Sequence, residues 1–187
     1  SEYLSEFGSE SNIGASSQLM TDAFFVLDKL VKDQKLGLPL GITAACRFTT
    51  CPGSIESQYS RRSLANVTDN IVAFKILFSG GDGLGFDDFI AAEGFPEVSE
   101  RILRNVDNAI SIANSLTGSL LEESSRITSS AEETACSNAF ASPDSANSDY
   151  GACRLNGAVK RVTDDLKIDF VTITGTNIPE GAQSDND

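Results

Sequence analysis

Residues 56–71 decide how this chain is organised, and they read Glu56-Ser57-Gln58-Tyr59-Ser60-Arg61-Arg62-Ser63-Leu64-Ala65-Asn66-Val67-Thr68-Asp69-Asn70-Ile71. The first half is polar and typical of a turn. The second half opens an apolar series that places one stripe on one face of a helix. The stripe consists of Leu64, Val67, Ile71, Phe74 and Leu77. We expect Ser60 or Ser63 to cap the start of this helix, and Ser79-Gly80-Gly81 to end it.

The polar part of this stretch therefore lies at a predicted helix N-terminus. Unpaired backbone N–H groups and the helix dipole favour an anion or a carboxylate there. The plainer interpretation is a capped helix with no ligand. The stretch alone does not decide between these two interpretations.

Three further amphipathic helices are predicted along the chain. The first begins at a cap near Ser16 or Ser17 and stops at Gly37 and Pro39. Another starts at Pro96 and is expected to carry its stripe through Leu120 and on into Thr134. The last one follows Leu155 to Phe170 and ends near Gly175. A short helix over 86–92 is predicted after the glycine-rich turn 80–85.

These patterns predict an all-α fold, namely an antiparallel four-helix bundle with long loops pinched by disulfides. Residues 1–16 form a polar lead-in, residues 17–178 form the helical bundle, and residues 179–187 form an acidic tail. Residues 171–174 have the composition of a strand, but they continue the helical stripe.

The length, hydrophobic content and net charge of the chain limit the class of protein. The chain has 187 residues with 40% hydrophobic residues, which suits one globular domain with a real core. Its formal net charge is -13, and such an acidic surface disfavours binding to nucleic acid and to anionic lipid. No apolar run in the sequence is long enough to cross a membrane. The chain begins at Ser1, and we expect residues to have been removed from its N-terminus.

The sequence contains no histidine. The usual acid–base group near neutral pH is therefore missing, as is the commonest protein ligand for zinc or iron. A self-contained hydrolase is improbable on this ground, while carboxylate sites for hard cations remain open.

Four cysteines, Cys46, Cys51, Cys136 and Cys153, occur as two pairs that are close in sequence. Neither pair has the two-residue gap of a redox or zinc motif. Three pairings are possible, and we predict the local one, Cys46–Cys51 with Cys136–Cys153. By loop-closure entropy the bonds would contribute about 2 and about 3 kcal/mol. Disulfides indicate a location outside the cytoplasm.

Several motifs also follow one another in the order found in a known family. They are Leu38-Pro39-Leu40-Gly41, Glu56-Ser57-Gln58-Tyr59-Ser60 with Ser63-Leu64 and Asn70-Ile71, Gly83-Leu84-Gly85-Phe86-Asp87-Asp88, the long helix that starts at Pro96, Leu166-Lys167-Ile168-Asp169-Phe170 and Asp185-Asn186-Asp187. In this order they resemble the second half of an imelysin-family protein, a family that includes insulin-cleaving membrane proteases and iron-regulated proteins. The resemblance implies two facing helical bundles with a site in the cleft between them.

The family signature, Gly-x-His-x-x-Glu, belongs to the first bundle and is absent from a chain without histidine. The resemblance therefore implies a partner, an N-terminal imelysin-like bundle that is either the chain's own cleaved half or a separate polypeptide. It implies a bacterial periplasmic or outer-surface protein, lipid-anchored through the missing N-terminus. No cofactor is expected on this chain alone, whereas iron or another divalent metal is expected in the complete protein.

Under this resemblance five residues face the cleft. Glu56 offers a carboxylate, Tyr59, Ser60 and Ser63 offer hydroxyl groups, and Asn70 offers an amide. The function implied is metal or ligand binding in iron acquisition. Two alternatives are the non-catalytic half of an imelysin-type metallopeptidase and a structural or interaction bundle without a ligand.

Overall fold

The computed structural model describes residues 13–145 and 149–175. Residues 1–12 of the predicted lead-in, residues 176–178 and the predicted tail 179–187 with its motif 185–187 lie outside this part. The described residues form helices and connecting loops without a strand, so the all-α prediction is confirmed. None of the described helices is both long and apolar enough to cross a membrane.

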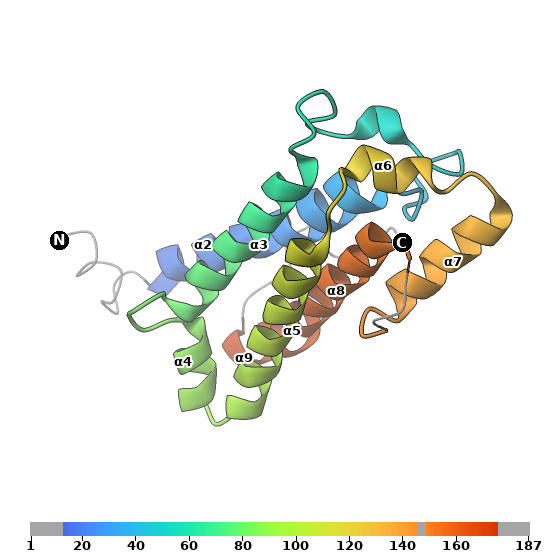
Figure 1. Ribbon diagram of the computed structural model, residues 1–187. Coiled ribbons are helices and arrows are strands. Elements are labelled where there is room, and N and C mark those ends of the chain that lie inside the picture. Colours follow the sequence, from blue (N-terminus) through green and yellow to red (C-terminus); the bar gives the residue numbers. More distant parts are fainter. Residues whose placement is uncertain (1–12, 146–148, 176–187) are drawn as a thin grey trace.

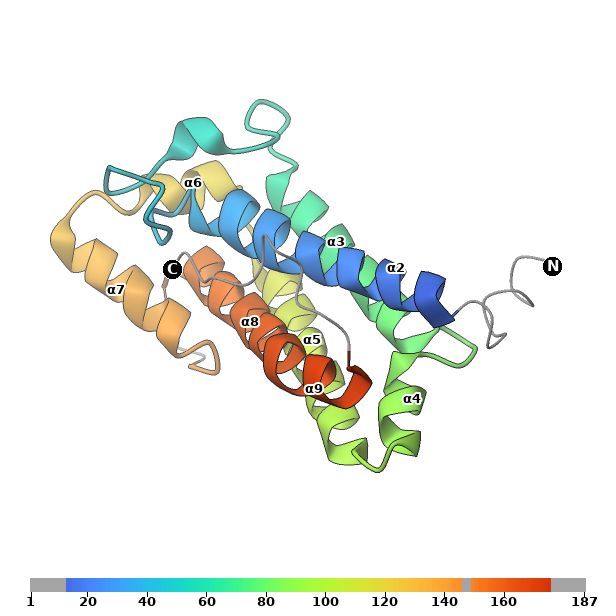
Figure 2. The same cartoon turned by 180° about the vertical axis from the view of Figure 1, so that it is seen from behind.

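The helices fall into four long segments and several short ones, shown in Figures 1 and 2. Helix α2 continues directly into the π-helix η2, and α8 continues through the π-helix η4 into α9. Their bounds are α2 Ile13–Phe25, η2 Val26–Gly37, η3 Pro52–Ser54, α3 Ser63–Ser79, α4 Phe86–Ala92, α5 Pro96–Ser115, α6 Leu120–Ser125, α7 Ser130–Ala141, α8 Gly151–Asp165, η4 Leu166–Phe170 and α9 Val171–Thr174.

One apolar core joins the long segments. Helix α5 packs against α8 and α3, and η2 packs against α8 and α3, so each long segment contacts two others. The predicted stripe of α3 is buried at Leu64, Val67, Ile71 and Phe74, and Phe78 takes the place predicted for Leu77. Such a stripe forms because burying one apolar face supplies most of the stability of a helix in a protein.

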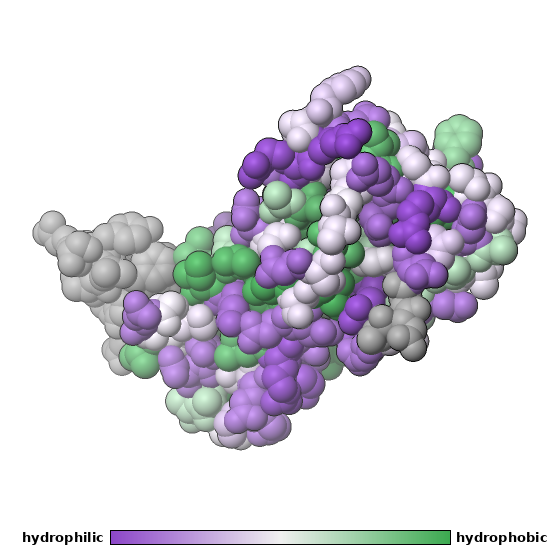
Figure 3. Space-filling view, viewed as in Figure 1, coloured by the Kyte–Doolittle hydropathy of each residue, from purple (hydrophilic) through white to green (hydrophobic). Residues whose placement is uncertain are grey.

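The surface is mostly polar, in keeping with the acidic composition. On the face shown in Figure 3, hydrophilic and neutral residues predominate, and hydrophobic ones gather near α2 and α3. Leu19 of α2 and Ile76 of α3 are exposed at 38% and 57%. Scattered apolar side chains of this kind are normal on a folded protein.

Two glycines make close approaches that a side chain would prevent. Gly80 ends α3 with φ 66°, and a Cβ there would lie 2.3 Å from the carbonyl oxygen of Leu84. A Cβ on Gly157 of α8 would lie 1.9 Å from the carbonyl oxygen of Phe140. Helix α7 therefore packs directly on the backbone of α8.

Three predicted helix boundaries are wrong. Helix α2 already begins at Ile13, so Ser16 and Ser17 lie inside it and do not cap it. The cap of α3 is Arg62 and has no side-chain hydrogen bond, so neither Ser60 nor Ser63 caps that helix. Helix α5 does not continue to Thr134, because it ends at Ser115 and Leu116 is extended.

Two capping boxes explain why separate helices, α6 and α7, follow α5 in place of one long helix. The side chain of Ser119 accepts a hydrogen bond from the backbone of Glu122, whose carboxylate accepts one from the backbone of Ser119. Ser129 and Glu132 repeat this arrangement at the start of α7. Each box begins a new helix, because it satisfies N–H groups that lack a partner in the first turn.

Both predicted disulfides are present, and the local pairing is confirmed. Cys46–Cys51 closes a loop in the connection between η2 and α3, with its Cα atoms 5.9 Å apart. Cys136–Cys153 joins α7 to α8, with its Cα atoms 5.4 Å apart. The short helix predicted over 86–92 is also confirmed, as α4.

We predict that the capping boxes weaken in acid. Hydrogen bonds from the backbone and hydroxyl of Thr128, and from Ser129, lower the pKa of Glu132 below its usual 4.5. Stability from this carboxylate is therefore present above pH 4.5 and is lost as the pH falls through the lowered native value. Glu132→Gln should lower the midpoint of thermal unfolding at pH 7, and this difference should shrink in acid.

Glu97→Gln serves as the control, because Glu97 also lies in a first helical turn and is exposed. Its unfolding midpoint should stay close to that of the wild type. A Glu132→Gln variant with an unchanged midpoint at pH 7 would contradict the role given to the box.

We also predict that the two disulfides are reduced in sequence. Cys136 and Cys153 are 2% and 1% exposed, whereas Cys46 and Cys51 are only half-buried. Because reduction requires a thiolate to reach a sulfur atom, a mild reductant should open Cys46–Cys51 first. Alkylation followed by peptide mass spectrometry should detect labels on this pair before the other. Earlier labelling of Cys136 would refute this order.

Candidate functional site

The structure connects two of the five predicted site residues through a lysine. Lys35 of η2 donates a hydrogen bond from Nζ to Oδ1 of Asn70, at 2.9 Å. The same Nζ lies 3.2 Å from Oε2 of Glu56. Glu56 and Asn70 thus meet around a cation supplied by the chain itself, and this contact ties the connection 38–62 to η2 and α3.

The predicted serines hold the turn that precedes α3. Ser63 is buried, and its Oγ accepts a hydrogen bond from the backbone N–H of Ser57. Ser60 donates from Oγ to the carbonyl oxygen of Ser57. Asn66 donates from its side-chain amide to Oγ of Ser57, at 3.1 Å. These bonds fix the path of the backbone on both sides of Tyr59.

Tyr59 projects from this turn and is 99% exposed. Two residues later, Arg61 has φ 57°, and within the described residues it is the one non-glycine residue with positive φ. Its guanidinium lies 3.2 Å from the carboxylate of Glu122, which anchors the turn to α6. An ordered turn therefore presents an aromatic ring to solvent, instead of packing it into the core.

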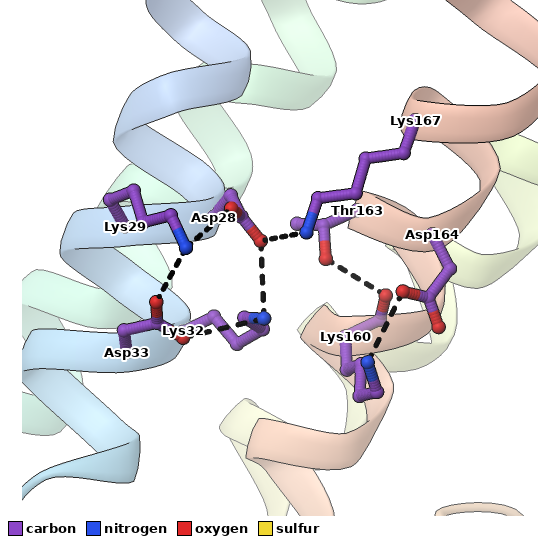
Figure 4. Close-up of polar contacts among 8 residues, drawn as sticks. All are labelled: Asp28, Lys29, Lys32, Asp33, Lys160, Thr163, Asp164 and Lys167. Carbon is purple, nitrogen blue, oxygen red and sulfur yellow. Dashed lines mark hydrogen bonds and ion pairs between the residues drawn. The ribbon is translucent and has the colours of Figure 1, made fainter. Parts of the chain in front are cut away.

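Five charged residues outside the predicted site form a cluster of ion pairs, shown in Figure 4. Four of them are buried, and the side chain of Lys167 is 12% exposed. We call Asp28, Lys29, Lys32, Asp33 and Lys167 the buried charge layer. The first four belong to η2 and the last to η4, so both described π-helices contribute. π-Helical turns are uncommon and frequently occur at functional sites.

Asp28 lies at the centre of this layer and is 0% exposed. Its carboxylate oxygens lie 3.2 Å from Nζ of Lys32, 3.2 Å from Nζ of Lys167 and 3.4 Å from Nζ of Lys29. Asp33 pairs with Lys29 at 3.1 Å and with Lys32 at 3.3 Å. Neither Asp28 oxygen has a hydrogen bond among the described residues, so ion pairs offset the cost of its burial.

One signal in the sequence did point to this layer. Asp28 and Lys32 form an i,i+4 pair, and Lys29 and Asp33 form a second pair of opposite direction. Such pairs usually lie on the exposed face of a helix, where they are worth only tenths of a kcal/mol. The sequence does not reveal that Lys167 approaches from more than a hundred positions away and closes the cluster.

Burial chiefly raises the pKa of the Asp87 carboxyl group, and the neighbouring Asp88 carboxylate adds to this shift. Asp87 lies in the first turn of α4, and its Oδ1 has no hydrogen-bond partner in the described part of the chain. No His, Cys, Asp or Glu residues of that part gather in threes as a metal ion would need.

Comparison with known proteins assigns no family to the chain. No protein-family model matches it, and neither a curated protein nor a solved structure is significantly similar to it.

We predict that removing one partner from the buried charge layer strongly destabilises the fold. Asp28→Asn removes the central carboxylate. Lys29 and Lys32 are then buried with Asp33 as their one remaining carboxylate, and the partly buried Lys167 loses its pair. Breaking a buried ion pair in this way should cost about 3–5 kcal/mol. Urea denaturation of the purified protein measures this loss.

Asp107→Asn is the matched control. Asp107 pairs with Lys75 at 2.6 Å but is 56% exposed, and exposed pairs contribute about 0–1 kcal/mol. An equal decrease in the free energy of unfolding for the two variants would show that burial does not make the ion pairs of the layer more important than exposed pairs.

Proposed function

We propose that this chain is an extracytoplasmic binding module, the second bundle of an imelysin-like two-bundle protein involved in iron acquisition. In this proposal its long helices form an antiparallel four-helix bundle. A histidine-bearing first bundle closes against the turn 56–63, and a metal or another ligand binds in the cleft between them. The observation that carries the proposal is the exposure of Tyr59 on an ordered turn.

The residue composition of the connection 38–62 supports the binding of a protein partner. Tyr59 and Phe48, which are 99% and 79% exposed, both belong to the connection 38–62. Arg47 and Arg62 of the same connection are exposed as well. Aromatic residues and arginine are enriched at protein interfaces and supply most hot spots. Covering an exposed aromatic side chain with a partner removes apolar surface from water, which stabilises the complex.

The metal-ligating side chains of the connection 38–62 are too few to hold a metal ion by themselves. Glu56 is the one carboxylate of the connection 38–62, and Lys35 already pairs with it. The proposal therefore takes the principal ligands from the partner, and assigns Glu56, Tyr59, Ser60, Ser63 and Asn70 to the wall of the cleft.

The two disulfides support a location outside the cytoplasm, where such bonds persist. Within the proposal the protein resides in the periplasm or on the outer surface of a bacterium. A lipid anchor on a preceding segment would hold it at the membrane.

The test begins with the protein purified from its native source without denaturant. Mass spectrometry should detect a second polypeptide with the Gly-x-His-x-x-Glu signature. Metal titration and a peptidase assay on that assembly then separate the functions. Metal binding without cleavage supports the proposal, chelator-sensitive cleavage supports the metallopeptidase half, and neither result supports a structural bundle. A lone species refutes the two-bundle proposal.

We predict that Tyr59→Ala weakens the assembly without unfolding the chain. The ring makes almost no contact within the chain, so its loss should leave the unfolding midpoint unchanged. Truncating a central interface aromatic should raise the dissociation constant of the two polypeptides about 30-fold or more. Titration calorimetry measures this constant.

Leu84→Ala is the control, because Leu84 is 89% exposed but follows the opposite end of α3. It should bind the partner as the wild type does. Equal affinity for Tyr59→Ala and wild type would place the interface elsewhere.

A further inference from the structure

A cavity of about 430 Å³ opens between the connection that follows η2 and helix α7. Its size falls in the range of sites for small molecules. Its walls combine apolar side chains with a few polar groups. The residues that matter here are Leu40, Ile42, Thr49, Glu133, Ser137 and Phe140.

Covalent bonds and close packing fix both walls of this cavity. On one side, the disulfide Cys46–Cys51 closes the loop, and the N–H of Cys51 donates to the carbonyl oxygen of Pro39 at 3.1 Å. On the other side, the disulfide Cys136–Cys153 and the contact of Gly157 with the backbone of Phe140 hold α7 on α8. A cavity between fixed walls is already formed before a ligand arrives, which lowers the cost of binding.

Glu133 is the one charged residue of the cavity lining. It follows Glu132, whose Oε2 accepts hydrogen bonds from Thr128 and Ser129. The carboxylate of Glu133 makes no ion pair or side-chain hydrogen bond with any residue in the described ranges, and the residue is half-buried. Of the two acids in the first turn of α7, one caps the helix and the other faces the cavity.

We propose that this cavity binds a small organic cation with an apolar body, such as an arylalkyl ammonium. The ammonium group would donate to the carboxylate of Glu133 and to the hydroxyl of Ser137, one helical turn further on. The apolar body would pack on Leu40, Ile42 and Phe140. The net charge of -13 raises the concentration of cations near the protein and so favours this class of ligand.

The test uses the oxidised 187-residue chain and 2-phenylethylammonium as the probe. Two-dimensional NMR titration should give saturable shifts confined to the turn 40–49 and to α7. The neutral 2-phenylethanol should bind at least tenfold more weakly, because it lacks the charge-assisted hydrogen bond. Phenylacetate, which has the same ring and the opposite charge, should not bind.

Two variants connect binding to this cavity. Glu133→Gln should lower the affinity for the probe about tenfold, while Glu97→Gln, in the first turn of α5, should leave it unchanged. Ser137→Phe should abolish binding by filling the space, and its exposed position allows the larger side chain without repacking the core.

The proposal is overturned if the probe does not saturate, if phenylacetate binds equally well, or if neither Glu133→Gln nor Ser137→Phe alters binding. The test uses this chain by itself, so its outcome does not depend on whether a second bundle exists.

Discussion

The ion pairs of Asp28 constrain how the first and last long segments of this protein meet. A carboxylate with no exposure is costly unless opposite charges surround it, and Asp28 has three lysines within 3.4 Å. Two of these lysines lie on η2, but Lys167 comes from η4 near the end of the described chain. A different register between these segments would leave the charge of Asp28 only partly compensated. These three ion pairs therefore favour the observed register of η2 against η4 over registers that would separate Lys167 from Asp28.

Much of the fold could be predicted from the sequence, because apolar periodicity and local cysteine spacing are short-range signals. They predict α3, α4, the start of α5, the course of α8 and both disulfides. The predicted extension of α5 is wrong, although apolar residues continue the spacing through Leu120. The capping box of Ser119 with Glu122 starts a new helix there instead. The π-helical register of η2 could not be predicted, since an i→i+5 ladder leaves no clear mark on composition.

The candidate site was predictable only in part, because contacts between distant segments do not appear in a linear pattern. The polar stretch before α3 could be found, and it does lie at a turn that presents Tyr59 to solvent. That Lys35 would join Glu56 to Asn70 required knowledge of how η2 lies beside α3. The cavity beside Glu133 could not be predicted for the same reason, since its two walls come from segments about ninety positions apart.

Both covalent cross-links are short in sequence, spanning separations of 5 and 17 residues. Neither of them joins η2 to α3 or α3 to α5. Under mechanical tension applied at its ends, the chain would therefore lengthen to nearly the full contour of an uncross-linked polypeptide, with only two small loops held back. Resistance to such pulling would come from the apolar contacts between the long helices and from the ion pairs around Asp28. The two disulfides would add little to it.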